Sequence, residues 1–243
     1  MRRVALCLPY YRNQQMLREQ LTRIAALPLR CRENLEVLIC DDGSPDGDAQ
    51  GFEIGCMLRI FKIGVDVRWN QDAARNVCAH FARAPWLLLT DMDHLVPAST
   101  WNFIQAAKLN PRSVYRFGRD TWEGTNAGGE PLLTPYKPHP NTWLMSAAMY
   151  WEIGGYDERF AGLYGTDALF REEVRRFAGE PVMLGWSVIR VPRETIADAS
   201  TVHYERKVKG VDDIEIPRRK IERDRIPNWR PLTRTFPYRQ IYP

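Results

Sequence analysis

Short apolar runs that suit buried strands alternate with segments of helical periodicity through the first 110 residues. We expect strands at residues 4–8, 35–40, 57–63 and 86–89, and helices at 14–27, at 71–83 and from Pro97 to about 108. Such alternation builds a mostly parallel sheet with helices on its faces. In open α/β sheets, ligands bind beyond the carboxyl ends of the strands. The sequence therefore predicts an α/β, Rossmann-like fold with its binding site at one defined edge.

Polar clusters follow two of these strands. Asp41 and Asp42 end the second strand, and Asp91 and Asp93 follow the fourth. A carboxylate pair spaced as in Asp91-x-Asp93 can hold one divalent cation, because Mg²⁺ and Mn²⁺ favour a few carboxylates together with substrate phosphates. Two loop carboxylates that cap the next helix are the alternative. Asp41 and Asp42 can accept hydrogen bonds from a base or ribose, or cap their own turn.

The pattern weakens after Asn110. Residues 121–141 contain three glycines and four prolines, which predicts a long irregular functional loop. Trp122 in this loop and the nearby Trp143 can stack on a sugar or a base. Farther on, a short helix is expected to end at Gly154, and Thr166 to cap a helix over 167–178.

Composition restricts the cellular context. The longest membrane-like stretch, residues 84–89, is too short to span a bilayer. The five cysteines show no C-x-x-C spacing, which indicates reduced thiols and a cytoplasmic protein, with peripheral membrane attachment left open. No G-x-G occurs anywhere, which excludes a Rossmann oxidoreductase, and no G-K-[S/T] occurs, which excludes a P-loop enzyme.

Positive charge is concentrated near the C-terminus. Residues 217–239 hold eight basic and two acidic side chains, a net +6 in a chain of net charge +4. Such a tail predicts an anionic partner: nucleic acid, an acidic glycan or a lipid headgroup. The alternative is a tail that packs on the domain through Ile226, Trp229, Phe236 and Tyr238.

Six motifs, in order, resemble those of GT-A fold glycosyltransferases of the large family two. They are Val4 to Tyr11, Glu36 to Ser44 with Asp-Asp-Gly-Ser, Ala74-Arg75-Asn76, Leu88 to Asp93, Gly154-Gly155-Tyr156-Asp157-Glu158, and Gly165-Thr166-Asp167. The resemblance covers residues 4–171. It implies a GT-A domain over 1–205, with a nucleotide-binding half (1–110) and an acceptor half (111–205), followed by a basic extension (206–243).

The resemblance also implies a role for each matching residue. Asp91 would touch the ribose or the metal, Asp93 would ligate Mn²⁺ or Mg²⁺, and His203 would be a third metal ligand. Asp167 would be the general base that takes a proton from the acceptor hydroxyl. The nucleotide, usually UDP, would be bound by Pro9, Tyr10, Tyr11, Asp41, Asp42, Arg75 and Asn76.

The implied reaction moves a sugar from a UDP-sugar to an acceptor hydroxyl, with inversion. A glycan or lipid-linked glycan ranks first as acceptor. A modified nucleic-acid base, held by Arg116, Arg119 and the basic tail, is a second candidate. Thr166 replaces the family's usual Glu and Leu169 stands where another acid is common, so a non-catalytic module that binds sugar or nucleic acid also stays open.

Overall fold

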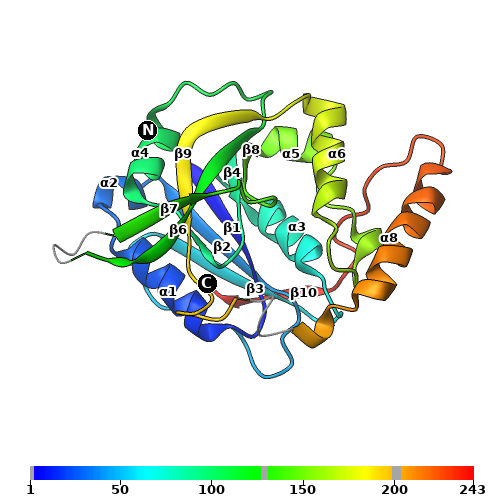
Figure 1. Cartoon of the computed structure of the whole chain (residues 1–243), viewed down its shortest axis with the longest axis horizontal. Helices are drawn as coiled ribbons and strands as arrows, with labels where there is room; N and C mark the ends of the chain where they lie inside the picture. Colours follow the sequence, from blue (N-terminus) through cyan, green and yellow to red (C-terminus); the bar gives the residue numbers. More distant parts are fainter. Residues whose placement is uncertain (1–2, 127–130, 199–203) are drawn as a thin grey trace.

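The structure, a computed structural model, describes residues 3–126, 131–198 and 204–243 (Figure 1). One ten-stranded sheet runs through these residues, with strand order β10-β3-β2-β1-β4-β8-β6-β9-β5 and with β7 paired to β6. The strands are β1 (Val4–Tyr10), β2 (Leu35–Asp41), β3 (Met57–Ile63), β4 (Trp86–Leu89), β5 (His94–Leu95), β6 (Tyr115–Thr125), β7 (Pro131–Tyr136), β8 (Trp143–Ser146), β9 (Val182–Arg190) and β10 (Tyr238–Tyr242). The α-helices are α1 (Gln14–Ala25), α2 (Leu29–Arg32), α3 (Gln71–Phe81), α4 (Ala98–Ala106), α5 (Ala147–Ile153), α6 (Asp167–Ala178) and α8 (Lys209–Asp224), with 3₁₀ turns η1 (Glu158–Phe160) and η2 (Tyr204–Arg206).

The first half of the sheet is parallel, as the sequence predicts. β1 lies between β2 and β4 and pairs with both in parallel, and β2 pairs in parallel with β3. All residues of β1 and β2 are buried because helices cover both faces. Alternate side chains of β1 enter different cores: Leu6 packs in the cluster that includes α1 and α4, and Cys7 in the cluster that includes α3, α5 and α6.

The second half of the sheet is mixed. β8 runs antiparallel to β4 and β6, whereas β6 and β9 are parallel. The prediction of an irregular loop over residues 121–141 is wrong in part, because β6 continues to Thr125 and pairs with β7 as a hairpin. Pro131 and Pro135 fit β7 because this strand pairs on one side and is exposed throughout. The pairing register of β6 shifts between Trp122 and Gly124. This shift interrupts the alternation of side chains by which a strand is recognised in a sequence.

The C-terminal segment joins the sheet. β10 pairs antiparallel with β3, so residues of the expected extension form a strand at the edge of the sheet. Seven of the eight basic residues in 217–239 contact partners within the chain. They are Arg218, Arg219, Lys220, Arg223, Arg230, Arg234 and Arg239. Trp229 lies under the Arg223 guanidinium at 3.9 Å, and Tyr238 packs edge-on against Phe81. The packed tail is therefore the alternative that the geometry favours.

Helix ends follow their sequence signals. Gly154 ends α5 at φ 105°, in the left-handed region where a Cβ would also meet Pro231 at 2.7 Å. Thr166 precedes α6 but does not cap it with its side chain. All five cysteines are free thiols. Within the described ranges, every helix falls short of the length and apolar character that a bilayer span requires.

Candidate active site

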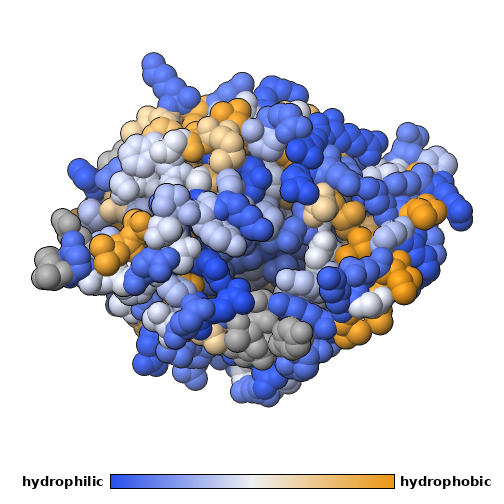
Figure 2. All heavy atoms as spheres, in the orientation of Figure 1, coloured by the Kyte–Doolittle hydropathy of each residue, from blue (hydrophilic) through white to orange (hydrophobic). Residues whose placement is uncertain are grey.

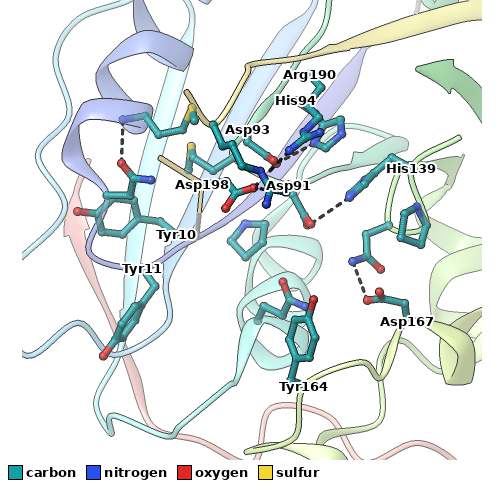
Figure 3. Close-up of a pocket in the computed structure, with 18 of the residues that line it drawn as sticks. Tyr10, Tyr11, Asp91, Asp93, His94, His139, Tyr164, Asp167, Arg190 and Asp198 are labelled. Atoms are coloured by element: carbon teal, nitrogen blue, oxygen red, sulfur yellow. Dashed lines mark hydrogen bonds and ion pairs between the residues drawn. The ribbon is translucent and has the colours of Figure 1, made fainter. Parts of the chain in front are cut away.

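A cleft of about 440 Å³ opens at the carboxyl ends of β1 and β4. Figure 2 shows this face hollowed near its centre, with hydrophilic residues around the hollow. Tyr10 and Tyr11 lie on one side of the cleft and Asp167 on the other, with Asp91 and Asp93 between them (Figure 3). The strand-end edge inferred from the sequence is therefore the edge that carries the cleft.

Asp91 is held by two basic side chains. Its Oδ1 accepts from the fully buried guanidinium of Arg75, and its Oδ2 lies 3.3 Å from Nε2 of His139. Burial acts to raise the pKa of Asp91, but Arg75 and then His139 outweigh it, so this pKa lies well below its usual range. Asp91 is thus ionised, and both of its oxygens have partners in the chain.

Asp93 leads into a second chain of polar contacts. Its Oδ1 lies 2.8 Å from Nδ1 of His94, and Nε2 of His94 lies 3.4 Å from a guanidinium nitrogen of Arg119. Because Arg119 can only donate, Nε2 of His94 accepts and Nδ1 carries the proton donated to Asp93. Burial acts to raise the pKa of Asp93, but His94 outweighs it and the net shift is downward.

The two histidines stack on each other. The rings of His94 and His139 are 3.8 Å apart at 29°. Burial first, and then His94, lowers the pKa of His139, so neutral imidazole is favoured. Its Nδ1 lies 3.0 Å from the Thr142 hydroxyl, which in turn contacts Thr90 at the end of β4. This network holds His139 beside Asp91.

One side chain of the cleft, that of Asp93, offers an oxygen that suits a divalent cation. Asp93 keeps Oδ2 without a hydrogen bond to any described residue, and its side chain is 18% exposed in the cleft. A carboxylate oxygen open to a cleft is a hard ligand of the kind Mg²⁺ and Mn²⁺ take along with phosphates. The described part of the chain contains no group of three or more His, Cys, Asp or Glu that could hold a metal ion. His203, the expected third ligand, lies outside the described residues.

Asp41 and Asp42 are both buried at the end of β2. Oδ1 of Asp41 accepts from the Ser44 amide at 2.8 Å, and Oδ2 of Asp42 accepts from the Asn70 amide at 2.9 Å. The other carboxylate oxygen of each is buried without a partner among the described residues. Burial raises the pKa of Asp41, and that of Asp42 more strongly. Of the two, only Asp42 lines the cleft, and its backbone N–H donates to the Tyr10 carbonyl at 2.8 Å.

Asp167 begins α6 and faces the cleft. Its Oδ1 accepts from Nδ2 of Asn141 at 2.8 Å, and its Oδ2 has no hydrogen bond within the described ranges. The preceding Thr166 is buried and donates its hydroxyl to Asp72 at 2.8 Å. Asp72 also pairs with Arg75 at 3.1 Å. Thr166 therefore links the start of α6 to the Arg75–Asp91 pair.

Several expected site residues lie away from the cleft. Arg75 contacts the cleft-lining residues Asp91 and Gln71 but does not line the cleft itself, and Asn76 is fully buried. The Asn76 amide binds the backbone of Tyr156 and a carboxylate oxygen of Glu158, so it ties α3 to the Gly-Gly turn. The expected stacking of Trp122 and Trp143 in the site is wrong, because neither lines the cleft and Trp143 packs against Phe170 in the core.

Several other cleft residues were not singled out by the sequence. They include His94, His139, Asn141, Tyr164, Arg190 and Asp198. Arg119, which the sequence suggested for a nucleic-acid acceptor, also lines the cleft. His139, Pro140 and Asn141 close the segment that the proline and glycine content marked as a functional loop. That content pointed to the segment, but only the folded chain shows which side chains turn inward.

The fold resembles those of solved glycosyltransferases. S. aureus TarS 1–349 superposes with a TM-score of 0.60 at 17% identity, over 79% of this chain and 61% of that chain. The same protein in complex with UDP-GlcNAc gives 0.60 at 17% identity, over 79% and 59%. The mannosyltransferase PcManGT from Pyrobaculum calidifontis, in complex with GDP-Man and Mn²⁺, gives 0.55 at 15% identity, over 78% and 57%. The architecture is that of the GT-A glycosyltransferases, and the chain spans about three fifths of the length of these proteins.

The sequence itself matches a family. The model of Glycosyl transferase family 2 matches residues 5–163, more than half of the chain. The protein therefore belongs to glycosyl transferase family 2, which confirms the resemblance seen in the six motifs. A search of curated proteins finds no match.

Proposed function

We propose that the protein transfers a sugar from a nucleoside-diphosphate sugar, with UDP as the expected nucleotide, to an acceptor hydroxyl. One observation carries the proposal. A single cleft holds Tyr10 and Tyr11 on one side, Asp91 and Asp93 in the middle, and Asp167 on the other. Asp42 also lines it and donates its backbone N–H to the Tyr10 carbonyl at 2.8 Å. A donor with its nucleotide near Asp42 would present its diphosphate to Asp93 and its sugar toward Asp167.

The nucleotide would lie against the β1 end. Pro9, Tyr10 and Tyr11 give this side of the cleft flat apolar and aromatic surface. The unpartnered Oδ1 of Asp42 would accept an N–H of the base. A buried acceptor without a partner is costly, so a ligand that supplies the hydrogen bond regains that cost. The S. aureus protein is solved with UDP-GlcNAc and with UDP, which agrees with this assignment.

A divalent cation would be held by Asp93 together with the diphosphate. When bound, Mn²⁺ or Mg²⁺ neutralises the negative charge that grows on the departing diphosphate. His94 donates to Oδ1 of Asp93 and so orients Oδ2. Both oxygens of Asp91 contact basic side chains, those of Arg75 and His139. Asp91 would contact the ribose of the donor or hold these two side chains in place. PcManGT is solved with Mn²⁺.

Asp167 would act as the general base. The amide of Asn141 holds Oδ1, which leaves Oδ2 to accept the proton of the attacking hydroxyl. Attack from this side, opposite the diphosphate, displaces the leaving group directly and inverts the configuration at the sugar carbon. The proposed acceptor is a glycan or a lipid-linked glycan.

The test combines nucleotide binding with turnover. We expect UDP with Mn²⁺ to raise the melting temperature more than UDP alone, and Asp93→Asn to remove the metal-dependent part. We expect Asp167→Asn to keep the UDP shift and to lose sugar transfer or donor hydrolysis by about 100-fold or more. If UDP-sugars bind to the wild-type protein but show no turnover that depends on Asp167, the protein is a binding module. If no nucleotide binds, the donor-site assignment is wrong.

A further inference from the structure

A second cluster of charge extends from Asp167 along α6. Arg171 and Arg175 follow Asp167 at intervals of four residues. Because four residues advance an α-helix by about 6 Å and slightly more than one full turn, the three side chains share one face. Asp167 faces the cleft, so this face leads from the proposed base out to solvent, where Arg175 is exposed. In Figure 1, α6 lies beside α5 on the β8 side of the sheet.

Arg116 of β6 completes the cluster. Its guanidinium lies over the Trp143 ring, with its central carbon 4.8 Å from the ring centroid, and Trp143 packs edge-on against Phe170 of α6. The neighbouring strand thus places Arg116 next to α6. Burial first, and then the charges of Arg171 and Arg175, lowers the pKa of Arg116. We refer to Arg116, Arg171 and Arg175 as the arginine track.

The arginine track has little counter-charge of its own. Arg175 pairs with Glu180 at 2.9 Å, and both side chains are at least half exposed. Arg116 donates to a neutral acceptor, the His139 carbonyl, at 2.5 Å, and its Nε is buried with no partner among the described residues. Arg116 and Arg171 make no ion pair within the described ranges. The carboxylates beside these three cations are Asp167, four residues before Arg171, and the exposed Glu180. Because incompletely paired like charges repel one another, negative charge from a ligand would stabilise the track.

Other arginines of the same region are paired. Arg176, next to Arg175 on the helix, lies 3.7 Å from Glu173 and packs over Phe177 and Trp229. The contrast is between two sides of one helix. On the side turned toward α8, Arg176 has the buried carboxylate of Glu173 as its partner. On the side that leads to Asp167, the ion pair among the described residues is the exposed Arg175–Glu180 contact, and Arg171 has none.

We propose that the acceptor is an anionic glycan, with phosphate or carboxylate groups that the arginine track binds while a hydroxyl of the same chain reaches Asp167. The inference rests on the proposed function and specifies its acceptor. Arginine suits both anions because its planar guanidinium donates two parallel hydrogen bonds to either group. An acceptor bound along α6 would place successive charges beside Arg171 and Arg175.

A glycan is favoured over nucleic acid. The affinity for nucleic acid that comes from counterion release grows with the number of phosphates neutralised, and the track offers only three cations. The basic C-terminal residues that were expected to add to it have seven of their eight side chains engaged within the chain.

The experiment measures anion binding without donor turnover. Fluorescein-labelled oligogalacturonate serves as the carboxylate probe and polyphosphate as the phosphate probe, with a neutral maltooligosaccharide and a single-stranded oligothymidylate of matched length for comparison. Anisotropy titrations at low and at physiological salt give the affinity of the full chain and of the Arg171→Gln/Arg175→Gln double variant. The matched control is Arg18→Gln, an exposed arginine on α1. UDP thermal shifts on the same samples report the donor site separately.

We expect one anionic probe to bind at least tenfold more tightly than the neutral glycan, with the double variant at least tenfold weaker and Arg18→Gln unchanged. The carboxylate and phosphate arms then identify the preferred anion. Equal binding of neutral and anionic glycans, or undiminished binding by the double variant, would overturn the proposal. Tightest binding of oligothymidylate that depends on Arg171 would overturn it in favour of nucleic acid. If the UDP shift is absent while anion binding depends on the track, the donor assignment fails and the track stands.

Discussion

Asn141 donates a hydrogen bond from Nδ2 to Oδ1 of Asp167 at 2.8 Å. Asn141 is 3% exposed, and its own Oδ1 is buried without a partner in the described structure. The amide therefore has one polar contact, and that contact fixes the carboxylate at the start of α6. In the proposed reaction this bond makes Asn141 the positioning residue for the base, since it sets which oxygen of Asp167 faces the acceptor.

Replacement of Asn141 by alanine is expected to lower kcat by roughly 10- to 100-fold. Without the amide, the Asp167 carboxylate can rotate, and misplacement of a base by about 1 Å has a cost of this size. UDP binding should stay within twofold of wild type, because Asn141 contacts the acid and not the nucleotide side. Steady-state kinetics and calorimetry check both values. Asn34→Ala, which removes a side-chain bond to the Arg30 carbonyl far from the cleft, is the control. Equal kcat for the two variants would contradict the positioning role.

UDP binding is expected to weaken as the pH falls. Burial holds the pKa of Asp42 well above its usual range, with the Asn70 amide opposing it. The proposed contact with the base needs the ionised carboxylate. Below the raised pKa, each pH unit adds about 1.4 kcal/mol to the cost of ionising Asp42 before the nucleotide binds. The affinity should therefore rise as the pH rises through that pKa and then level off.

Calorimetric titration of UDP in metal-free buffer between pH 5 and 8 measures this dependence. Asp42→Asn should bind UDP more weakly at the upper end and lose the part of the slope that Asp42 contributes, since the amide does not titrate. The terminal phosphate of UDP also titrates in this range and contributes equally with both proteins. A slope in Asp42→Asn equal to that of the wild type would assign the proton to another group.

Loss of the Arg75 charge is expected to destabilise the fold by about 3–5 kcal/mol. Arg75 is fully buried and pairs with both Asp72 and Asp91, so Arg75→Met leaves the buried Asp72 without its cation and the partly exposed Asp91 with His139 alone. Burial already raises the pKa of Asp72 to about 6, although Arg75 opposes the shift. Urea denaturation at pH 7 measures the loss, with Arg18→Met as the exposed control.

The pair can also be tested by rescue. Asp72→Asn in the Arg75→Met background removes one of the stranded charges and should recover part of the lost stability. If Asp72→Asn lowers the stability of the single variant further, the penalty comes from lost packing and not from uncompensated charge.

The first half of the fold, residues 1–110, was predictable because its signals are local. Buried strands such as Val4–Tyr10 are short apolar runs, and turn residues such as Asp41 and Asp42 mark where they end. The topological rule for α/β sheets then places Asp42, Asp91 and Asp93 at one edge, where the cleft lies. Neither step needs knowledge of distant contacts.

The part of the fold after residue 110 was less predictable because its contacts are long-range. β7 is an exposed edge strand with two prolines, so neither alternation nor composition marks it as a strand. Asn141 lies 26 residues from Asp167, and His139 is 48 residues from Asp91 in sequence. Such pairs follow from how β8 is placed between β4 and β6. Likewise, the excess of basic residues near the C-terminus can be counted from the sequence. The residues that these side chains contact could not be predicted from it.

The last prediction concerns Glu158, which attaches the C-terminal segment to the domain. Its carboxylate accepts from the Asn76 amide at 2.8 Å, from the backbone N–H of Arg234 at 2.6 Å, and from the backbone N–H and hydroxyl of Thr235 at 2.7 and 2.6 Å. Glu158 is 5% exposed. Its removal strands several donors, which costs about 1–3 kcal/mol for each buried group left unpaired.

Glu158→Ala is therefore expected to lower the free energy of unfolding by at least 2–3 kcal/mol, on the order of a few such donors. It should also expose the chain near residues 225–237 to limited proteolysis, because the attachment directly precedes β10. The matched control is Glu152→Ala, whose carboxylate makes one exposed ion pair with Arg112 and should change stability by less than about 1 kcal/mol. Equal losses in the two variants would mean that pairing of β10 with β3 alone holds the segment. A larger loss in Glu158→Ala, with cleavage confined to the C-terminal segment, would make the Asn76–Glu158 contact the link between α3 and the tail.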